Sequence, residues 1–489
     1  MSLINILLLQ NAPATLFFSN QFGYTDGANH GHSLNTGLQK FHIIMPKVME
    51  NAPLPVLEFH YHDFYLPKSG VAKMNRIGRF RWVICALLFF ACVVNYMDRQ
   101  VLGLLKPDLS RTYGWSETDY ARMAIFFQFA YAIGQAGFGS FMNWIGIKRA
   151  YALSVLFWSL SAMSHALCRT VPGFSAARLA LGLGESGNFP AAIRVVTEWF
   201  PPKERSVATG IFNTGSNMGA IFAPLLVPLI VGAFGGWQAA FITLGCVDLV
   251  WLMFWLKFYS APEKSKRVSA AELAHIHEGV APTAEEKLPW LKLMRYREAW
   301  AYFSTCILGP VWWFYGFWLP DFFNKQFHLD LKHFGLPLAF VALSAALGSI
   351  GGGGLSAYFL KRGWPVNRAR KTASFICACC TLPVILTPYV SSPWLAAAFF
   401  GLAGAAHQGW SATMYTVVSD IFPKRAVASV VGFGGMLASF LSMGFFYLVG
   451  HVLQGEGTYK SIMLICGSAY LVAWTIFHLG VPKIKPVKI

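Results

Sequence analysis

The chain has 489 residues, of which 55% are hydrophobic and only 12% are charged, and its mean hydropathy is +0.47. A soluble domain carries charge on roughly 25% of its residues, so this composition excludes an ordinary soluble protein and favours a helical protein that crosses a membrane many times. The formal net charge of +17 does not indicate nucleic acid as a partner, because the basic residues lie in loops between apolar runs.

Residues 1–73 differ from the rest of the chain. They are rich in His, Asn and Pro and show no sustained helical period, and the run INILLLQ lacks the basic start and the cleavage site of a signal peptide. Met74 opens the short basic stretch MNRIGRFRW directly before the first long apolar run. We therefore expect residues 1–73 to be a disordered N-terminal extension and Met74 to be the natural start.

The histidine and cysteine residues do not predict a metal site. The run His60-Tyr61-His62-Asp63 has ligand residue types but stands alone in the sequence. The nine cysteines, an odd number, lie mostly in apolar runs, where they are expected to pack as small side chains and not to form a disulfide framework. We expect neither a metal ion nor a cofactor.

Twelve apolar segments follow the extension, and a polar stretch divides six from six. The sequence predicts an all-α polytopic membrane protein with two six-helix bundles, residues 74–259 and 299–489, the second ending in a short tail. The polar stretch, residues 260–298, is expected to be a cytoplasmic linker with some amphipathic helix. The segments are placed near residues 81–105, 117–142, 149–168, 172–197, 205–231, 237–259, 299–324, 332–359, 370–390, 392–419, 425–451 and 459–481.

The distribution of Lys and Arg predicts the orientation of these segments. Basic residues precede the first segment and cluster in alternate loops, including Lys148 with Arg149 and Lys203 with Arg205. Cytoplasmic loops are enriched in Lys and Arg, so we expect a multi-pass protein of the inner (plasma) membrane with both termini in the cytoplasm. The loops of the opposite side are sparse in basic residues and contain Lys106, Arg111, Arg169, Lys325, Lys332 and Lys460.

An internal repeat supports the division into two halves. The run VVTEWFP at 195–201 matches VVSDIFP at 417–423. Repeated halves in a membrane protein are typical of alternating access around a site at their interface. The constant offset of the repeat places His407 opposite Glu185 and Trp410 opposite Asn188, so we expect Glu185 and His407 to face the central cavity from opposite sides.

Two pairs of charged residues interrupt the apolar segments of the first half. Arg178 and Glu185 are seven residues apart, nearly two helical turns, so both point to one face. Asp98 and Arg99 are adjacent and point about 100° apart, so each needs a partner elsewhere. An ionisable group at membrane depth costs roughly 2.5 kcal/mol or more, so such residues usually face a wet cavity or a partner.

The structural alternatives remain open at this point. Arg178 and Glu185 are also compatible with an ion pair that clamps two helices, and Asp98 and Arg99 with a wetted helix end. The functional interpretation is that the two arginines bind an anionic, hydroxylated substrate, because an Arg presents a planar fork suited to a carboxylate. Asp98 and Glu185 then serve as proton carriers, since burial and a nearby Arg act in opposite directions on a carboxyl group.

Several motifs add a family resemblance to this interpretation. The chain from about residue 74 to 485 resembles the major facilitator superfamily, within its anion:cation symporter family, and specifically the hexuronate transporter group. The motifs are NYMDR (95–99), RLALGLGESGNFPA (178–191), ERSVATGIFNTGSNMGA (204–220), KRGWPVNRARK (361–371), AHQGWSA (406–412) and VSDIFPKRAVASVVGFGGM (418–436).

The resemblance implies the major facilitator fold of twelve transmembrane helices in two bundles. It implies that Asp98 and Glu185 handle protons and that Arg99 and Arg178 hold the substrate carboxylate. It also implies a sugar site at Tyr96, Tyr131 and Asn213.

The tenth segment supplies the candidate residues of the second half. Its polar residues need partners within the membrane, so we expect His407, Gln408, Trp410 and Ser411 to bind substrate. A histidine that is hydrogen-bonded within its own bundle is an equally reasonable interpretation of His407.

The sequence therefore predicts a proton-coupled symporter that imports sugar acids, most favourably galacturonate or glucuronate, and not an enzyme. The expected partners are the sugar-acid anion, protons and the lipid bilayer, and the protein is expected to be a monomer. The alternatives are a transporter of aldonates or other organic anions by symport or exchange, and a receptor that binds a sugar acid without transporting it.

Overall fold

The computed structural model describes residues 78–279 and 294–487, all of which lie in one compact unit, Lys73–Ile489. The expected extension at residues 1–73 lies outside the described residues, and so does the run His60-Tyr61-His62-Asp63. Within the described residues, all regular secondary structure is helical.

Each of the twelve predicted segments is helical. The first six correspond to α2 (Phe80–Tyr113), α3 (Glu117–Ile145), α4 (Ile147–Ser164) with the short 3-10 helix η2 (His165–Leu167), α5 (Val171–Glu185) with α6 (Asn188–Trp199), α7 (Arg205–Phe234) and α8 (Gln238–Phe258). The last six correspond to α11 (Arg297–Thr305) with α12 (Leu308–Phe327), α13 (Gly335–Lys361), α14 (Val366–Thr381) with η4 (Leu382–Tyr389), α15 (Pro393–Ile421), α16 (Lys424–Glu456) and α17 (Lys460–Gly480).

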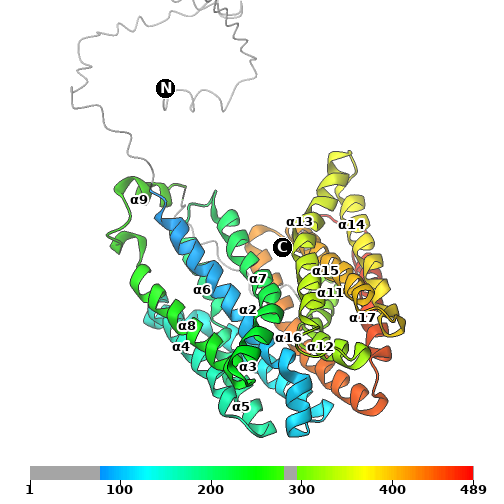
Figure 1. Ribbon diagram of the computed structural model, residues 1–489. Helices are drawn as coiled ribbons and strands as arrows, with labels where there is room; N and C mark the ends of the chain where they lie inside the picture. Colours follow the sequence, from blue (N-terminus) through cyan, green and yellow to red (C-terminus); the bar gives the residue numbers. More distant parts are fainter. Residues whose placement is uncertain (1–77, 280–293, 488–489) are drawn as a thin grey trace, which may run out of the picture. The chain divides into compact units, whose positions relative to one another are not determined.

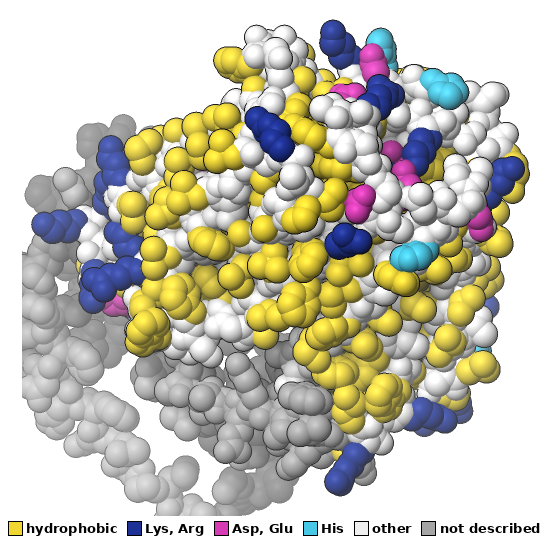
Figure 2. Space-filling model, turned by 90° about the horizontal axis from the view of Figure 1, so that it is seen from below, with side chains coloured by type: hydrophobic (Ala, Val, Ile, Leu, Met, Phe, Trp, Pro, Cys, Tyr) yellow, Lys and Arg dark blue, Asp and Glu magenta, His cyan; other side chains and the backbone are white. Residues whose placement is uncertain are grey.

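Eight of the described helices are long and apolar enough to cross a membrane by length and composition. The other four predicted spans are either divided into two helices, as in α5–α6 and α11–α12, or rich in polar residues, as in α3 and α15. Figure 2, a view from below, shows apolar side chains over much of this face. Large apolar side chains are also exposed along helices of both halves, as helices that face lipid require.

The helices form two groups that follow the halves of the sequence, blue to green and lime to red in Figure 1. In the first half α2 packs against α7 and α8, α3 against α5, and α4 against α8. In the second half α15 packs against α13 and α14, and α12 against α16. The halves meet along three helix pairs, α2 with α12, α3 with α16, and α7 with α13.

The fourth predicted segment is divided immediately after Glu185. Glycines on both sides of the division allow neighbouring helices to approach: a Cβ on Gly184 would lie 2.8 Å from Trp158, and one on Gly187 would lie 2.3 Å from the hydroxyl of Ser154. Ser154 donates a hydrogen bond of 2.6 Å to the carbonyl of Gly184. Glu185 is therefore the last residue of α5 and is held by close packing against α4.

Part of the linker folds against the first half. Helix α9 (Ala270–Ile276) contributes Glu272, whose carboxylate binds Arg81 at 3.3 Å, and His275, which lies 3.0 Å from Glu204. Arg81 also binds Glu204 at 2.8 Å, and this hydrogen bond lowers the pKa of Glu204 below its ordinary value. The start of α2 is thereby connected to the linker through charged groups.

Four charged residues join the two halves at one end of the molecule. Lys106 of α2 lies 2.7 Å from Glu117 of α3 and 2.7 Å from Asp321 of α12. Lys325 of α12 pairs with both carboxylates, and Tyr459 donates a hydrogen bond to Asp321. Lys106 is only 1% exposed, so its assignment to a loop was wrong: α2 continues eight residues beyond the predicted end of the segment.

We predict that Asp321→Asn destabilises this structure markedly. The substitution leaves Lys106 buried with a weakened set of partners, and breaking a buried ion pair costs about 3–5 kcal/mol. Thermal unfolding in detergent, followed by tryptophan fluorescence, should show a lowered Tm. The matched control is Asp108→Asn, which breaks an exposed pair with Arg111 on the same helix as Lys106 and should change stability by no more than about 0.5 kcal/mol. Equal melting temperatures for the two variants would contradict the prediction.

Candidate functional site

A cavity of about 520 Å³ lies between the two halves. Helices α2, α6 and α7 form one wall, and α12, α13 and α15 form the other. The first wall consists of Tyr96, Arg99, Gln100, Phe189, Thr209, Asn213, Ser216, Asn217 and Ala220. The second consists of Trp312, Trp313, Tyr315, Gly316, Phe317, Leu319, Pro320, Leu338, Val341, Ala342, Ala345, His407, Gln408, Ser411 and Tyr415.

Polar groups from both halves meet in this cavity. The amide of Gln408 in α15 donates a hydrogen bond of 3.4 Å to Asn217 in α7, so the two walls are in direct contact. The cavity can therefore present hydroxyl and amide groups to one ligand from two sides. The residues predicted from sequence that line it are Tyr96, Arg99, Asn213, His407, Gln408 and Ser411.

Arg99 is the charged residue in the wall. Its Nε and one terminal nitrogen each lie 2.8 Å from the carboxylate of Glu185, and that terminal nitrogen also donates to Asn95 at 3.3 Å. The other terminal nitrogen, Nη1, is buried and has no hydrogen-bond partner of ordinary geometry among the described residues. Arg99 therefore holds one carboxylate in this state, and its remaining terminal nitrogen is enclosed by protein.

Aromatic rings surround the guanidinium of Arg99. The ring centroids of Tyr96 and Tyr131 lie 4.7 Å from it, and that of Trp313 in the opposite half lies 4.9 Å from it. Such rings attract a cation through their negative faces and exclude water from it. Tyr131 does not line the cavity. It contacts Arg99, so any effect of Tyr131 on a ligand is indirect.

Arg178 lies behind Arg99 and does not line the cavity. Its side chain is 1% exposed, and its Nη2 donates to the backbone carbonyl of Arg99 at 3.2 Å. The ring of Phe127 lies 4.9 Å from the guanidinium. In this state Arg178 supports the backbone that carries Arg99, and the two arginines do not form a common fork.

The two predicted proton carriers are both buried outside the cavity. Glu185 pairs with Arg99 of α2 and not with Arg178 of its own helix, so it takes part in an ion pair between two helices, as in the structural alternative that the sequence left open. Asp98 is 2% exposed and lies in the middle of α2, next to Asp248 of α8. It is therefore not at a wetted helix end, because α2 continues to Tyr113.

His407 combines both of its expected environments. It lines the cavity, and its Nδ1 lies 2.5 Å from the hydroxyl of Tyr470 in the same half. Its ring stacks on Trp312 at 4.6 Å with an interplanar angle of 3°. The repeat predicted that His407 and Glu185 both face the cavity. His407 lines its wall, whereas Glu185 does not and contacts Arg99, which does.

Trp410 lines a smaller neighbouring cavity of about 170 Å³ together with His407 and Ser411.

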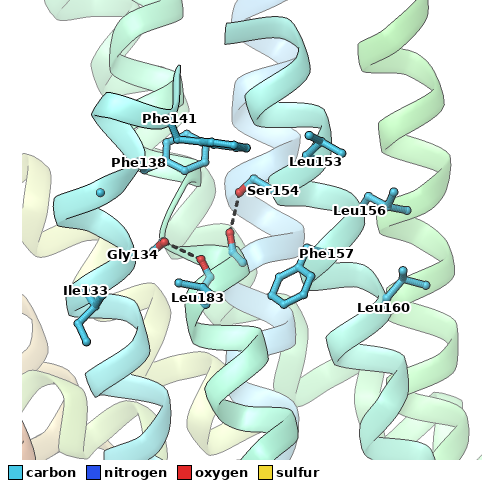
Figure 3. Close-up of a pocket in the computed structure, with 13 residues that line it drawn as sticks. Ile133, Gly134, Phe138, Phe141, Leu153, Ser154, Leu156, Phe157, Leu160 and Leu183 are labelled. Atoms are coloured by element: carbon cyan, nitrogen blue, oxygen red, sulfur yellow. Dashed lines mark hydrogen bonds between the residues drawn. The ribbon is translucent and has the colours of Figure 1, made fainter. Parts of the chain in front are cut away.

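A second large cavity, of about 570 Å³, lies among α3, α4 and α5. Figure 3 shows its apolar lining, with Phe138 and Phe141 on one side and Leu156, Phe157 and Leu160 on the other. Its two hydroxyl groups, from Ser154 and Ser186, each donate to a backbone carbonyl of α5 at 2.6 Å. This cavity has no charged group in its lining and does not suit an anion.

Sequence reasoning missed several residues around the site. Tyr470, the partner of His407, could not be recognised from sequence, because tyrosine is common in apolar helices. Asp248 and Asp321 could have been recognised: each is a single acidic residue within an apolar run, the same feature that identified Glu185. Applying that rule to every segment would have found both.

Comparison with known proteins agrees with this architecture. The model of the Major Facilitator Superfamily matches residues 88–447. The chain is 30% identical to the hexuronate transporter of Escherichia coli (strain K12) over 419 residues, 83% of this chain and 96% of that protein. It is 32% identical to the galacturonate transporter of Dickeya chrysanthemi over 294 residues, 59% of this chain and 85% of that protein. A crystal structure of a D-xylose-proton symporter superposes with a TM-score of 0.65 at 14% identity, covering 83% of this chain and 99% of that one.

Proposed function

The chain belongs to the Major Facilitator Superfamily, and we propose that it is a proton-coupled symporter that imports sugar acids, most favourably hexuronates such as galacturonate and glucuronate. The family prediction made from the motifs is confirmed, and with it the major facilitator fold of a transporter that is not an enzyme. The sugar-acid specificity is supported by the names of the two similar proteins.

The observation that carries this proposal is the position of Arg99. It is a guanidinium in the wall of an otherwise uncharged cavity, with an unpaired nitrogen and aromatic rings around it. A carboxylate is the ligand that such a fork binds best. Amide and hydroxyl groups of Asn213, Gln408 and Ser411 supply partners for the hydroxyl groups of a sugar, and His407 adds a ring nitrogen.

Coupling follows from the competition between two carboxylates for Arg99. Glu185 binds two of its nitrogens. A substrate carboxylate that binds the guanidinium weakens this pair, and a buried carboxylate without its cation is strongly unfavourable. Protonation of Glu185 removes that cost, so substrate and proton bind together. Arg178 contributes by holding the backbone of Arg99, and Tyr131 by packing on its guanidinium.

The direction that the cavity faces follows from the charges at the helix ends. The network of Lys106, Glu117, Asp321 and Lys325 joins the halves at the end with few basic loop residues. By the distribution of Lys and Arg this end is external. We therefore assign the structure to a state closed to the outside, in a monomeric protein of the inner membrane with cytoplasmic termini.

Uptake into proteoliposomes tests the proposed function. Purified protein should accumulate labelled galacturonate or glucuronate when an inward proton gradient is imposed, and a protonophore should abolish accumulation. Gluconate tests the aldonate alternative, and glucose tests the need for a carboxylate. Tight glucose binding, or uronate accumulation that is indifferent to the proton gradient, would overturn the proposal.

We predict that Arg99→Lys lowers uronate affinity by about ten- to a hundred-fold. Lysine keeps the charge but cannot form the bidentate contact, and losing a charge-assisted hydrogen bond costs about 1.5–3 kcal/mol. Equilibrium binding of the labelled uronate measures the change. The matched control is Arg194→Lys, at an exposed pair with Glu198, which should leave affinity unchanged. Equal affinities for the two variants would remove Arg99 from the site.

We predict that Glu185→Gln separates substrate binding from proton coupling. Glutamine resembles the protonated carboxyl group, so the variant should retain counterflow of uronate between the two sides of the vesicle. It should lose accumulation driven by a proton gradient. Glu198→Gln is the control, because Glu198 lies outside the cavity and pairs with Arg194 and Tyr259. A Glu185→Gln transporter that still concentrates uronate would exclude Glu185 as the essential carrier.

A further inference from the structure

A pair of acidic residues is buried inside the first half, one from α2 and one from α8. We propose that Asp98 and Asp248 form a proton-binding site in which two carboxyl groups share one proton. Its use in transport rests on the function proposed above, whereas the existence of the shared proton does not.

The carboxyl groups of this pair are isolated from solvent. Asp98 is 2% exposed and Asp248 is fully buried. The two carboxyl groups interact directly, and the indole of Trp158 in α4 lies beside Asp248. Both oxygens of Asp248 and one of Asp98 nevertheless have no hydrogen bond of ordinary geometry with any described residue, the Trp158 indole included. A proton between the two groups supplies the donor that this arrangement lacks.

The charged groups around the pair indicate how many protons it holds. The charges of Arg178 and Glu185, both from α5, interact electrostatically with the two aspartates. His165 in η2, which also packs against α8, faces Arg178 and has its Nδ1 2.8 Å from the carbonyl of Ser161.

The balance of buried charges then indicates how many protons the two aspartates hold. Glu185 is compensated by Arg99 at 2.8 Å, so Arg178 is the cation left for the two aspartates. Arg178 forms no ion pair within 4 Å with a described acidic residue, and its single charge balances at most one of the two aspartates. At least one of them must therefore be neutral, because an uncompensated buried charge costs several kcal/mol. Two carboxyl groups that share a site ionise in this stepwise manner.

A metal cation is a poorer occupant of this site than a proton. Hard cations such as Ca²⁺ take six to eight oxygen ligands, whereas this site offers two carboxyl groups. The described residues contain no group of three or more His, Cys, Asp or Glu side chains placed to hold a metal. A proton needs only the two oxygens that face each other.

Infrared spectroscopy of the purified protein tests the shared proton directly. At neutral pH, wild type should show the C=O stretch of a buried carboxylic acid, which shifts after exchange into D₂O. Asp248→Asn and Asp98→Asn should each lose this band, because the remaining carboxylate is compensated by Arg178. Asn resembles the protonated acid in shape, and an unchanged Tm identifies a folded variant. Asp108→Asn, at an exposed position on α2, should keep the band.

Three results would overturn the proposal: no acid band in wild type, a band that survives both single substitutions, or a band that appears only when Na⁺ is removed. In proteoliposomes, Asp248→Asn should import one proton fewer per sugar acid than wild type. An unchanged number would overturn the role of the pair in transport. The infrared result is independent of the substrate, so a wild-type protein that fails to transport uronates but shows the band refutes the proposed function alone.

Discussion

The ion pair between Arg99 and Glu185 is the interaction on which the rest of the site depends. It connects α2 to the end of α5, and both partners are almost fully buried. A buried pair of this kind adds little net stability but is costly to break on one side only. The surrounding structure is accordingly built to hold it: Arg178 binds the backbone of Arg99, and the division after Glu185 places that carboxylate at a helix end.

The ion pairs at the two ends of the molecule join different parts of the chain. One end is joined across the halves by Lys106 and Asp321 with their partners, whereas at the other end Arg81 binds Glu204 and Glu272 within the first half and the linker. In the alternating access expected from the proposed function, an interaction across the halves breaks, whereas one within a half can persist. The charges therefore distinguish the contacts that change from those that move as a unit.

Most of the fold and part of the site could be predicted from sequence. Hydrophobic runs gave every helical segment, since apolar length is the strongest signal in a membrane protein, and the motifs gave the family. The sequence predicted that Arg99 and Arg178 bind substrate together, but residue spacing does not show that only Arg99 of these two arginines lines the cavity. The divided helix at Ser186–Gly187 was missed for a similar reason: glycines that permit close packing are also common in continuous membrane helices.

Arg99 and Glu185 both belong to the first half, so in the proposed transport cycle the pair moves with that half when the transporter returns without substrate. Moving one elementary charge through the membrane potential is worth about 2.3 kcal/mol per 100 mV. A neutral pair carried on one rigid group of helices moves no net charge and gains nothing from that potential. In the proposed cycle this pair therefore adds no voltage dependence to the return of the empty carrier, and any such dependence comes from the other buried charges of the first half, Arg178 and the Asp98–Asp248 pair.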